Sequence, residues 1–239
     1  MAQYFWQPDP ADVGNPPSDL VFDQPASSGG IASTEIIQIS EWGWDTYAWN
    51  LQWGSNTWNF LRFVSFYSET IGQSSEVEIF VEGVFASGFS NMAISPKVWL
   101  SSETAYKARM RHGNHIRKVG PGRNFVELAS GNTSDGGSRI RMRVGDGFQK
   151  IKWWEAPEFD VEEPTNWLLE TSDADFTGVA DTGMLNIYSN TGACRLVSIG
   201  IGTDGDPAPT TPVPVGPTTP TGLITSNITA NSFRAGWTP

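Results

Sequence analysis

The carboxylates best placed for acid–base chemistry lie in one short segment, at Glu76, Glu78 and Glu82. Alternate residues of an extended strand point to the same side, so these side chains share a face if the segment is a strand. Glycoside hydrolysis needs two carboxyl groups at a fixed separation across the scissile bond. However, Phe80 stands where a regular alternation needs the next acid, and Val81 stands where a bulged strand needs it. The spacing does not favour catalysis, and we expect an ordinary solvated strand face and no catalytic residue.

Tryptophan side chains form the second group that could bind a ligand, because an indole ring offers an apolar face to a sugar ring. Five of the 11 Trp residues are clustered, at Trp42, Trp44, Trp49, Trp53 and Trp58. Large aromatic residues of β-sandwiches are mostly core residues, so we expect most of this cluster to be buried. Trp42 and Trp44 alternate with Glu41, Gly43 and Asp45, which predicts an exposed loop. We therefore predict Trp42 and Trp44 as the glycan-binding residues.

The histidine and aspartate residues form no pattern typical of a metal site. His112 and His115 flank a Gly-Asn pair, so a turn could bring them together, but no cysteine or dense carboxylate cluster lies beside them. Acidic turns that begin at Asp173 and Asp204 contain oxygen ligands that calcium accepts, but such turns are common. We therefore expect no metal and no cofactor. The sequence also contains no phosphate-binding loop or nucleotide-binding motif.

The composition excludes several classes of partner. The chain has 239 residues, is 38% hydrophobic and has a formal net charge of −11, so it can bury a core but does not attract phosphate or anionic lipid. We expect no nucleic-acid partner and no membrane insertion. The first 30 residues contain no Lys or Arg and no long apolar run, which predicts neither a signal peptide nor a transmembrane segment. The single cysteine, Cys194, is expected to be a buried structural residue.

The middle of the chain alternates apolar and polar residues in short runs separated by Gly, Asn, Ser and Asp, which predicts antiparallel strands. The clearest strands are predicted at residues 47–53, 58–66, 77–82, 97–100, 106–111, 125–128, 139–144, 148–154, 184–188 and 196–201. No segment has a convincing helical period. We therefore expect an all-β fold, a two-sheet antiparallel jelly-roll sandwich over residues 35–205.

One predicted hairpin places a row of arginines on a single strand face. Residues 139–144 and 148–154 are joined by a three-residue loop that contains two glycines. Arg139, Arg141 and Arg143 alternate with apolar residues, and such a row of like charges repels unless acids lie opposite. We expect a solvated outer face on which glutamate rows pair with these arginines.

The two ends of the chain differ in composition from the sandwich. Residues 1–34 contain five prolines, and because proline cannot donate to a strand ladder we expect an extended arm. Tyr4, Phe5 and Trp6 in this arm either fold back over the sandwich or dock on a partner protein. Residues 206–219 are rich in Pro and Thr, which predicts a semi-rigid linker and a domain boundary. Residues 220–239 contain two short apolar patterns, too few to hold a core alone.

This last segment resembles the first two strands of a fibronectin type III module. The residues that carry the resemblance are Pro220, Gly222, Leu223 and Trp237, which match core positions of that family. The resemblance covers only about the last 20 residues. It implies that residues 220–239 are the start of such a module.

The larger block resembles the concanavalin-like, or laminin-G-like, jelly rolls of tail and fibre proteins in tailed bacteriophages. The similar segments are residues 151–157, 163–167 and 199–209, the last of which ends the domain just before the linker. The resemblance implies a virion structural protein, a tail, fibre or surface-decoration component, with other virion proteins as partners. It also implies self-association, as a trimer in the case of a fibre, and attachment to a host glycan.

Two alternatives stay open beside the virion hypothesis. One is a carbohydrate-binding module of a secreted polysaccharide-active protein, because the jelly roll is shared by lectins, hydrolases and scaffolds. The other is a glycosidase that uses the Glu76 to Glu82 segment, which the spacing of its acids disfavours.

Overall fold

The computed structural model contains strands and one short 3-10 helix, and it describes residues 3–18, 22–23, 31–41, 43–53, 59–63, 74–85, 91–99, 104–109, 114–120, 124–131, 137–155, 161–188, 193–213, 224–229 and 232–236. The elements are β1 Gln3–Trp6, η1 Pro10–Asp12, β2 Phe22–Asp23, β3 Ile31–Glu41, β4 Trp44–Trp53, β5 Asn59–Phe63, β6 Val77–Phe85, β7 Asn91–Trp99, β8 Thr104–Arg109, β9 Asn114–Val119, β10 Phe125–Gly131, β11 Gly137–Gly145, β12 Phe148–Glu155, β13 Leu169–Thr171, β14 Asp181–Tyr188, β15 Ala193–Thr203, β16 Ile224–Thr229 and β17 Ser232–Gly236.

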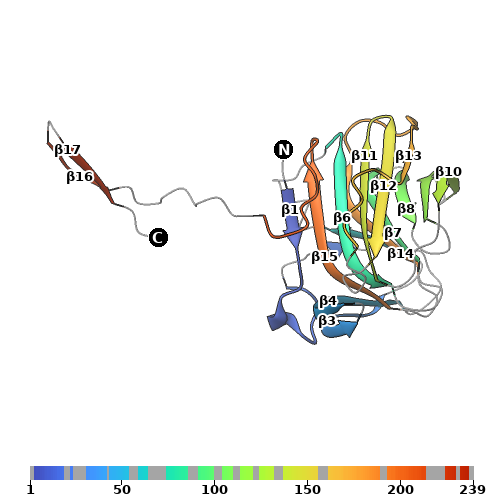
Figure 1. Ribbon diagram of the computed structural model, residues 1–239, viewed down its shortest axis with the longest axis horizontal. Helices are drawn as coiled ribbons and strands as arrows, with labels where there is room; N and C mark the ends of the chain where they lie inside the picture. The colour runs from blue at the N-terminus through green and yellow to red at the C-terminus, as the bar shows by residue number, and fades with distance from the viewer. Residues whose placement is uncertain are drawn as a thin grey trace.

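Two antiparallel sheets form the sandwich. The larger has eight strands in the order β13-β12-β11-β6-β15-β4-β3, with β1 added beside β15. The smaller has seven strands in the order β10-β9-β8-β7-β14-β5-β2. Figure 1 shows β15, β6, β11 and β12 side by side, while β3 and β4 lie across the lower end of the sandwich. The chain is therefore an all-β, two-sheet antiparallel jelly-roll sandwich, and the predicted fold class is confirmed.

The alternation of apolar and polar residues determines which faces meet. Along β6, Val77, Ile79 and Val81 are buried in the core between the sheets, whereas the residues between them point to the outer side of the larger sheet. The same cluster contains inward residues of the neighbouring strands, among them Ile140, Met142, Val144, Leu196, Ile199 and Ile201. Because one side of the sheet faces this core, the register of every strand is fixed and the polar residues are forced outward.

Each of the ten predicted strands overlaps an observed strand, but β1, β2, β3, β9 and β13 were not predicted. Strand β9 includes His115, which the sequence places beside a turn. Strand β3 begins at Ile31 and runs for 11 residues, with apolar residues at Ile36, Ile37 and Ile39 that serve both sides of the sheet. Apolar residues on both faces hide the simple alternation that identifies a half-buried strand.

The N-terminal segment is not the free arm that its prolines suggest. The first six residues contain no proline, so Gln3–Trp6 can form β1, which pairs antiparallel with β15. The indole of Trp6 is buried and packs edge to face on Trp49, with ring centroids 5.9 Å apart. The expectation of an extended arm over residues 1–34 is therefore wrong at β1 and at the start of β3. Tyr4, Phe5 and Trp6 lie on the protein's own sandwich, one of the two predicted alternatives.

The start of the predicted linker also belongs to the sandwich. After β15 the chain turns at Asp204, whose φ is 55°, and residues 206–212 run back over the outer side of the larger sheet. We call this segment the C-terminal strap. Further along the chain, β16 and β17 pair as an antiparallel hairpin. The predicted core residues Pro220, Gly222, Leu223 and Trp237 lie outside the described residues. Within the part of the chain that the structure describes, no helix is long and apolar enough to cross a membrane.

Candidate functional site

The outer side of the larger sheet carries the row of charges that the sequence predicts. Arg139 on β11 donates through Nε to Oε1 of Glu82 on β6, over 2.6 Å. Arg143 pairs with Glu76 in the same way. These pairs confirm that glutamates of β6 lie opposite the arginines of β11. The glutamate row therefore neutralises the like charges of the arginine row.

The central pair of this row is not solvated. Nη1 of Arg141 lies 2.5 Å from Oε1 of Glu78, and the two residues are only 6% and 2% exposed. Nη1 of Arg141 also donates to the carbonyl oxygen of Ala208, over 2.6 Å, and the Ala208 N–H donates to Glu78 over 3.0 Å. The predicted solvated face is thus wrong at its centre, because the C-terminal strap covers it. Hydrogen bonds to the strap satisfy charges that burial would otherwise penalise.

Two glycines of β15 make room for the strap. A Cβ on Gly200 would lie 1.9 Å from the carbonyl oxygen of Pro209, and a Cβ on Gly202 would lie 2.3 Å from that of Asp206. Only residues without a side chain let the backbone approach so closely. Nε2 of Gln3 on β1 donates to the carbonyl oxygen of Pro207 over 2.7 Å, which fixes the strap from the other side. The strap is therefore an integral part of the outer side of the sheet.

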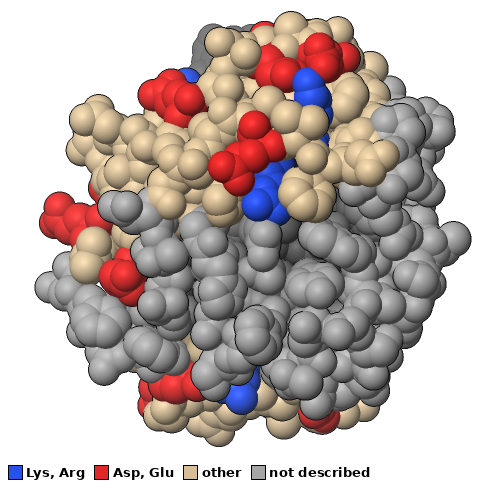
Figure 2. Space-filling model, turned by 90° about the vertical axis from the view of Figure 1, so that its right-hand side faces the viewer, with Lys and Arg blue, Asp and Glu red and all other residues tan. Residues whose placement is uncertain are grey.

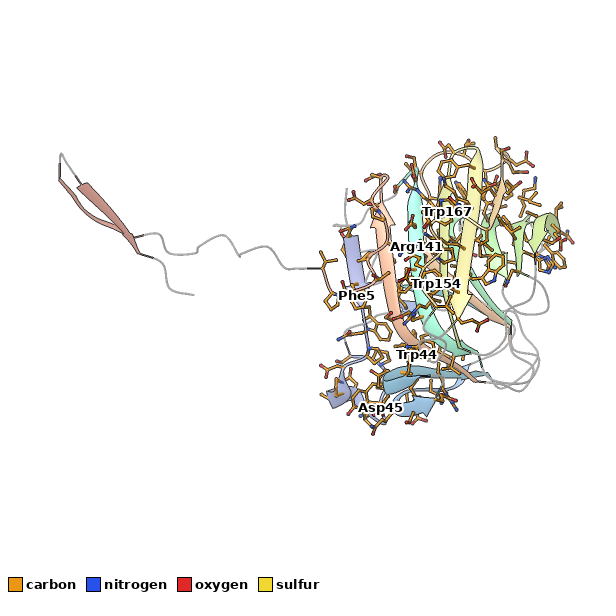
Figure 3. The ribbon with its side chains drawn as sticks, in the orientation of Figure 1. Phe5, Trp44, Asp45, Arg141, Trp154 and Trp167 are labelled. Carbon is orange, nitrogen blue, oxygen red and sulfur yellow. The ribbon has the colours of Figure 1, made fainter. Side chains whose placement is uncertain are left out.

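A first recess of about 280 Å³ opens beside the strap. It is lined by Phe80, Glu82, Arg139, Trp154, Glu163 and Thr210. Phe80 and Trp154 stack with ring centroids 5.8 Å apart, and they bury Ala208 of the strap between β6 and β12. Figure 3 shows Trp154 near Arg141, across the sheet from Phe5. The first recess combines an aromatic floor with carboxylate, guanidinium and hydroxyl groups, as small-molecule sites do.

Glu163 reaches this recess from the loop before β13. It accepts hydrogen bonds from Arg141 Nε over 2.8 Å, and its Oε1 lies 2.6 Å from Nζ of Lys152. Burial alone raises the pKa of Glu163, but the hydrogen bonds from Lys152 and Arg141 outweigh it and lower the pKa below its ordinary value. Glu163 is therefore ionised at neutral pH and is an acceptor of hydrogen bonds, not an acid.

A second recess of about 350 Å³ lies on the other side of the strap. Its residues come from the N-terminal segment, from β4, β6 and β15, and from the strap. They are Phe5, Gln7, Pro8, Pro10, Thr46, Tyr47, Glu82, Val197, Ser198, Thr210, Thr211 and Pro212. Phe5 points to the outer side of the sheet because Tyr4 and Trp6, its neighbours along β1, pack against the core. Among these described lining residues, Glu82 is the one charged residue, and the others have hydroxyl, amide, aromatic or apolar side chains.

Trp44, one of the two predicted glycan-binding tryptophans, lines neither recess. Trp44 is only 8% exposed and packs with Ile39, Ala48, Val84 and Val197 on the outer side of the sheet, so the prediction that it is exposed is wrong. Glu41 and Asp45 belong to strands and not to a loop. Glu41 on β3 pairs with Trp44 on β4, and Asp45 pairs with Ser40. Trp42 lies outside the described residues. Figure 3 shows Trp44 at the lower end of the sandwich, away from Trp154.

The histidines and aspartates singled out in the sequence have structural partners. Nδ1 of His115 lies 2.7 Å from Oε2 of Glu127, while His112 lies outside the described residues. Asp173 accepts hydrogen bonds from Lys118, over 2.8 Å, and from the Tyr106 hydroxyl, over 2.5 Å. Asp204 accepts from Ser74, over 2.8 Å. Among the described residues, no group of three or more His, Cys, Asp or Glu side chains is placed to hold a metal ion.

Side chains of opposite charge lie close together on the visible surface and on the outer side of the larger sheet. On the described residues of the side drawn in Figure 2, Lys and Arg side chains lie next to Asp and Glu side chains.

Two cation–π contacts hold the loop before β13 against the sheet. The Nζ atoms of Lys150 and Lys152 on β12 lie over the ring of Trp167 in that loop, 5.4 and 5.2 Å from its centroid.

Several lining residues were not predicted from the sequence, notably Phe80, Trp154 and Thr210. In the sequence, Phe80 interrupts the acidic pattern and Thr210 falls within the predicted linker. One signal was available, because Gly200 and Gly202 alternate on one strand face and are soon followed by Pro207 and Pro209. Such alternate glycines indicate a close backbone approach to the strand.

No known protein family matches the sequence, and no curated protein sequence matches it. Among solved structures, a protein of unknown function from Shewanella oneidensis MR-1 is similar, with 10% identity and a TM-score of 0.50 over 83% of this chain and 84% of that chain. Carbohydrate-binding module CBM66 from Bacillus subtilis aligns with 9% identity and a TM-score of 0.45 over 72% and 94% of the two chains. A carbohydrate esterase from the Shiga toxin-encoding bacteriophage phi24B aligns with 13% identity and a TM-score of 0.42 over 75% and 90%. The likeness to the Shewanella protein concerns the fold alone.

Proposed function

We propose that this chain is a non-catalytic, glycan-binding jelly-roll module, with the first recess as its binding site. The observation that carries the proposal is the grouping of Glu82, Arg139, Glu163 and Thr210 around the stacked Phe80 and Trp154. Ionised carboxylates accept hydrogen bonds, a guanidinium donates them, and a hydroxyl does both. A sugar presents hydroxyl groups that donate and accept, together with an apolar ring face, so it matches all of these groups at once.

The charges of the recess favour a neutral ligand. Glu82 is already paired with Arg139, and Glu163 with Arg141 and Lys152. An anionic ligand meets the carboxylates of Glu82 and Glu163, and a cationic ligand meets the guanidinium of Arg139. A neutral sugar avoids both repulsions while it uses the free lone pairs and N–H groups of the paired side chains.

The same ion pairs are the reason to propose binding without catalysis. A retaining or inverting glycosidase needs one carboxyl group that is protonated near neutral pH. Glu78 faces away from solvent beneath the strap, bound to Arg141 and to the Ala208 N–H. Glu82 accepts hydrogen bonds from Arg139 and Ser198. A general acid must present its carboxyl group to the glycosidic oxygen. The strap covers Glu78, and guanidinium and hydroxyl donors hold both oxygens of Glu82, so neither group is placed for that role.

We further propose that this module belongs to the virion of a tailed phage, as a tail, fibre or surface-decoration component that attaches to a host glycan. The support is the sequence resemblance to phage jelly rolls, the Pro/Thr-rich segment and the fibronectin-like start that follows it. In this setting the partners are other virion proteins and further copies of the same chain, with a trimer in the case of a fibre. The alternative is a carbohydrate-binding module of a secreted polysaccharide-active protein, for which the recess serves equally well.

A glycan array tests the binding function. We expect the wild-type protein to bind neutral glycans. The affinity of Glu163→Gln for them should be about tenfold lower, because one carboxylate oxygen that accepts hydrogen bonds is replaced by an amide NH₂ group that donates them. Glu170→Gln is the matched control, because Glu170 is exposed on β13 and lines neither recess. Absence of binding to every neutral glycan contradicts the proposal. Release of reducing sugar from any bound polysaccharide contradicts its non-catalytic part.

Immunolabelling separates the virion from the alternative. Antibodies against the protein, imaged by negative-stain electron microscopy, are expected to label phage particles at a fixed position. Labelling confined to a secreted protein fraction favours the carbohydrate-binding module of a polysaccharide-active protein and contradicts the virion assignment.

A further inference from the structure

We infer that the two recesses are successive subsites of one binding groove, so that the ligand is an oligosaccharide of at least two neutral sugar residues. This inference rests on the proposed glycan-binding function and extends it to the length of the ligand. Its basis is that Glu82 and Thr210 line both recesses. A ligand that leaves the first recess past Thr210 therefore enters the second.

The carboxylate of Glu82 is held so that it serves both sides. Its Oε1 accepts from Nε of Arg139 over 2.6 Å, and its Oε2 accepts from the Ser198 hydroxyl, also over 2.6 Å. Arg139 lines only the first recess and Ser198 only the second. A carboxylate has about four acceptor positions, and these two bonds occupy two of them. Each oxygen thus keeps one lone pair for a hydroxyl group of the sugar on its own side.

The second recess has the chemistry of a neutral sugar site. Apart from Glu82 its polar groups are uncharged, and include Gln7, Thr46, Ser198 and Thr211. Phe5 and three proline rings supply apolar surface, against which the C–H face of a pyranose can pack. With about 350 Å³ it is the larger of the two recesses, so it has room for at least as large a sugar residue as the first.

Seven of the twelve described residues that line the second subsite come from the two terminal segments of the described sandwich. Phe5, Gln7, Pro8 and Pro10 come from the N-terminal segment, and Thr210, Thr211 and Pro212 come from the strap. Ordered contacts with the sheet hold both segments in place. Trp6 anchors β1 in the core, and Glu78 and Arg141 hold the strap through Ala208. These two terminal segments therefore select the length of the ligand, whereas most of the first subsite comes from β6, β11 and β12, with Glu163 and Thr210 added to it.

Titration calorimetry with defined sugars tests the inference. The probes are glucose, mannose and galactose, with cellobiose, maltose, mannobiose and galactobiose and the corresponding trisaccharides. We expect the preferred disaccharide to bind about tenfold more tightly than its monosaccharide, as one or two added hydrogen bonds would give. Phe5→Ala and Thr211→Trp remove this gain, so that the disaccharide then binds no more tightly than the monosaccharide, because both residues line the second recess. Val13→Ala, an exposed residue of the same terminal segment outside both recesses, changes neither affinity.

The outcomes distinguish the inference from the function on which it rests. Sugar binding without a gain from monosaccharide to disaccharide overturns the inference and leaves glycan binding intact. An equal loss of monosaccharide and disaccharide affinity in Phe5→Ala and Thr211→Trp also overturns it. No binding of any probe contradicts the proposed function and the inference together. Both variants should unfold near the temperature at which the wild-type protein unfolds. In that case, a loss of the extra affinity for the disaccharide results from a change in the second subsite and not from misfolding.

Discussion

Arg141 Nη1 lies 2.5 Å from Glu78 Oε1, and the strap residue Ala208 is hydrogen-bonded to both side chains. One buried ion pair thus joins β6, β11 and the segment that follows β15. We expect Arg141→Met to lower the free energy of unfolding by about 3–5 kcal/mol, because it leaves the Glu78 carboxylate buried without its main partner.

Arg195→Met is the matched control, since Arg195 on β15 of the same sheet pairs with Glu41 and these two side chains are 29% and 31% exposed. A partly exposed pair contributes at most about 1 kcal/mol. Urea denaturation of the two variants measures the difference. Equal losses of stability would show that the strap does not bury the central pair in solution.

Gly200→Ala tests the close approach of the strap to β15. The added methyl group meets the Pro209 carbonyl, so the strap must shift, at a cost of about 1–3 kcal/mol. We also expect faster proteolytic cleavage within the strap. Gly120→Ala is the control, because a Cβ there meets only the carbonyl oxygen of Asn124, at 3.8 Å. A strap that is cleaved as slowly in Gly200→Ala as in the wild type contradicts this packing.

Acid should remove part of the stability through Glu163. Its pKa is lower in the folded protein than in the unfolded chain, so the unfolded chain binds more protons as the pH falls below about 4.5. The stabilisation from the Glu163 ion pairs is fully present above that pH and is lost as the pH falls through the folded pKa. Thermal unfolding should be measured between pH 7 and pH 3. As the pH falls, the unfolding temperature should decrease less for Glu163→Gln than for the wild type. If the unfolding temperatures of the variant and the wild type decrease equally with pH, these ion pairs contribute nothing to the stability of the fold.

The Cys194 thiol should not react in the folded protein. Cys194 is buried in the core on β15, and burial raises the pKa of its thiol, so the reactive thiolate is scarce. We expect no labelling by iodoacetamide at pH 8 in native buffer and complete labelling in 6 M guanidinium chloride. Rapid labelling under native conditions would place Cys194 outside the core. The prediction from sequence that Cys194 is buried is confirmed.

The fold was predictable because the core residues follow simple alternation. On β11, Ile140, Met142 and Val144 face inward between three arginines, and the pattern gives both the strand and its orientation. Strand β1 was not predictable in the same way, because its four residues precede a proline-rich segment and their partner, β15, lies almost 200 residues away. Long-range pairing of a short strand leaves little trace in local sequence.

The candidate site was only partly predictable, because burial decides which aromatic residues can meet a ligand. Trp44 and Trp154 look alike in sequence, and both are largely buried, but only Trp154 lies beside a recess. The first recess exists because the strap covers Glu78 and places Thr210 beside Trp154. No periodicity in the Pro-rich segment indicates this docking, which depends on Gly200 and Gly202 in another element.

The structure of a complex tests the central claim most directly. A crystal of the protein soaked with the tightest-binding glycan of the array should show one sugar residue in the recess of Trp154 and Glu82, and the next past Thr210 beside Phe5. Hydroxyl groups of the two sugars should lie within hydrogen-bond distance of the two oxygens of Glu82. A glycan bound elsewhere on the sandwich, with both recesses filled only by water, would contradict the account.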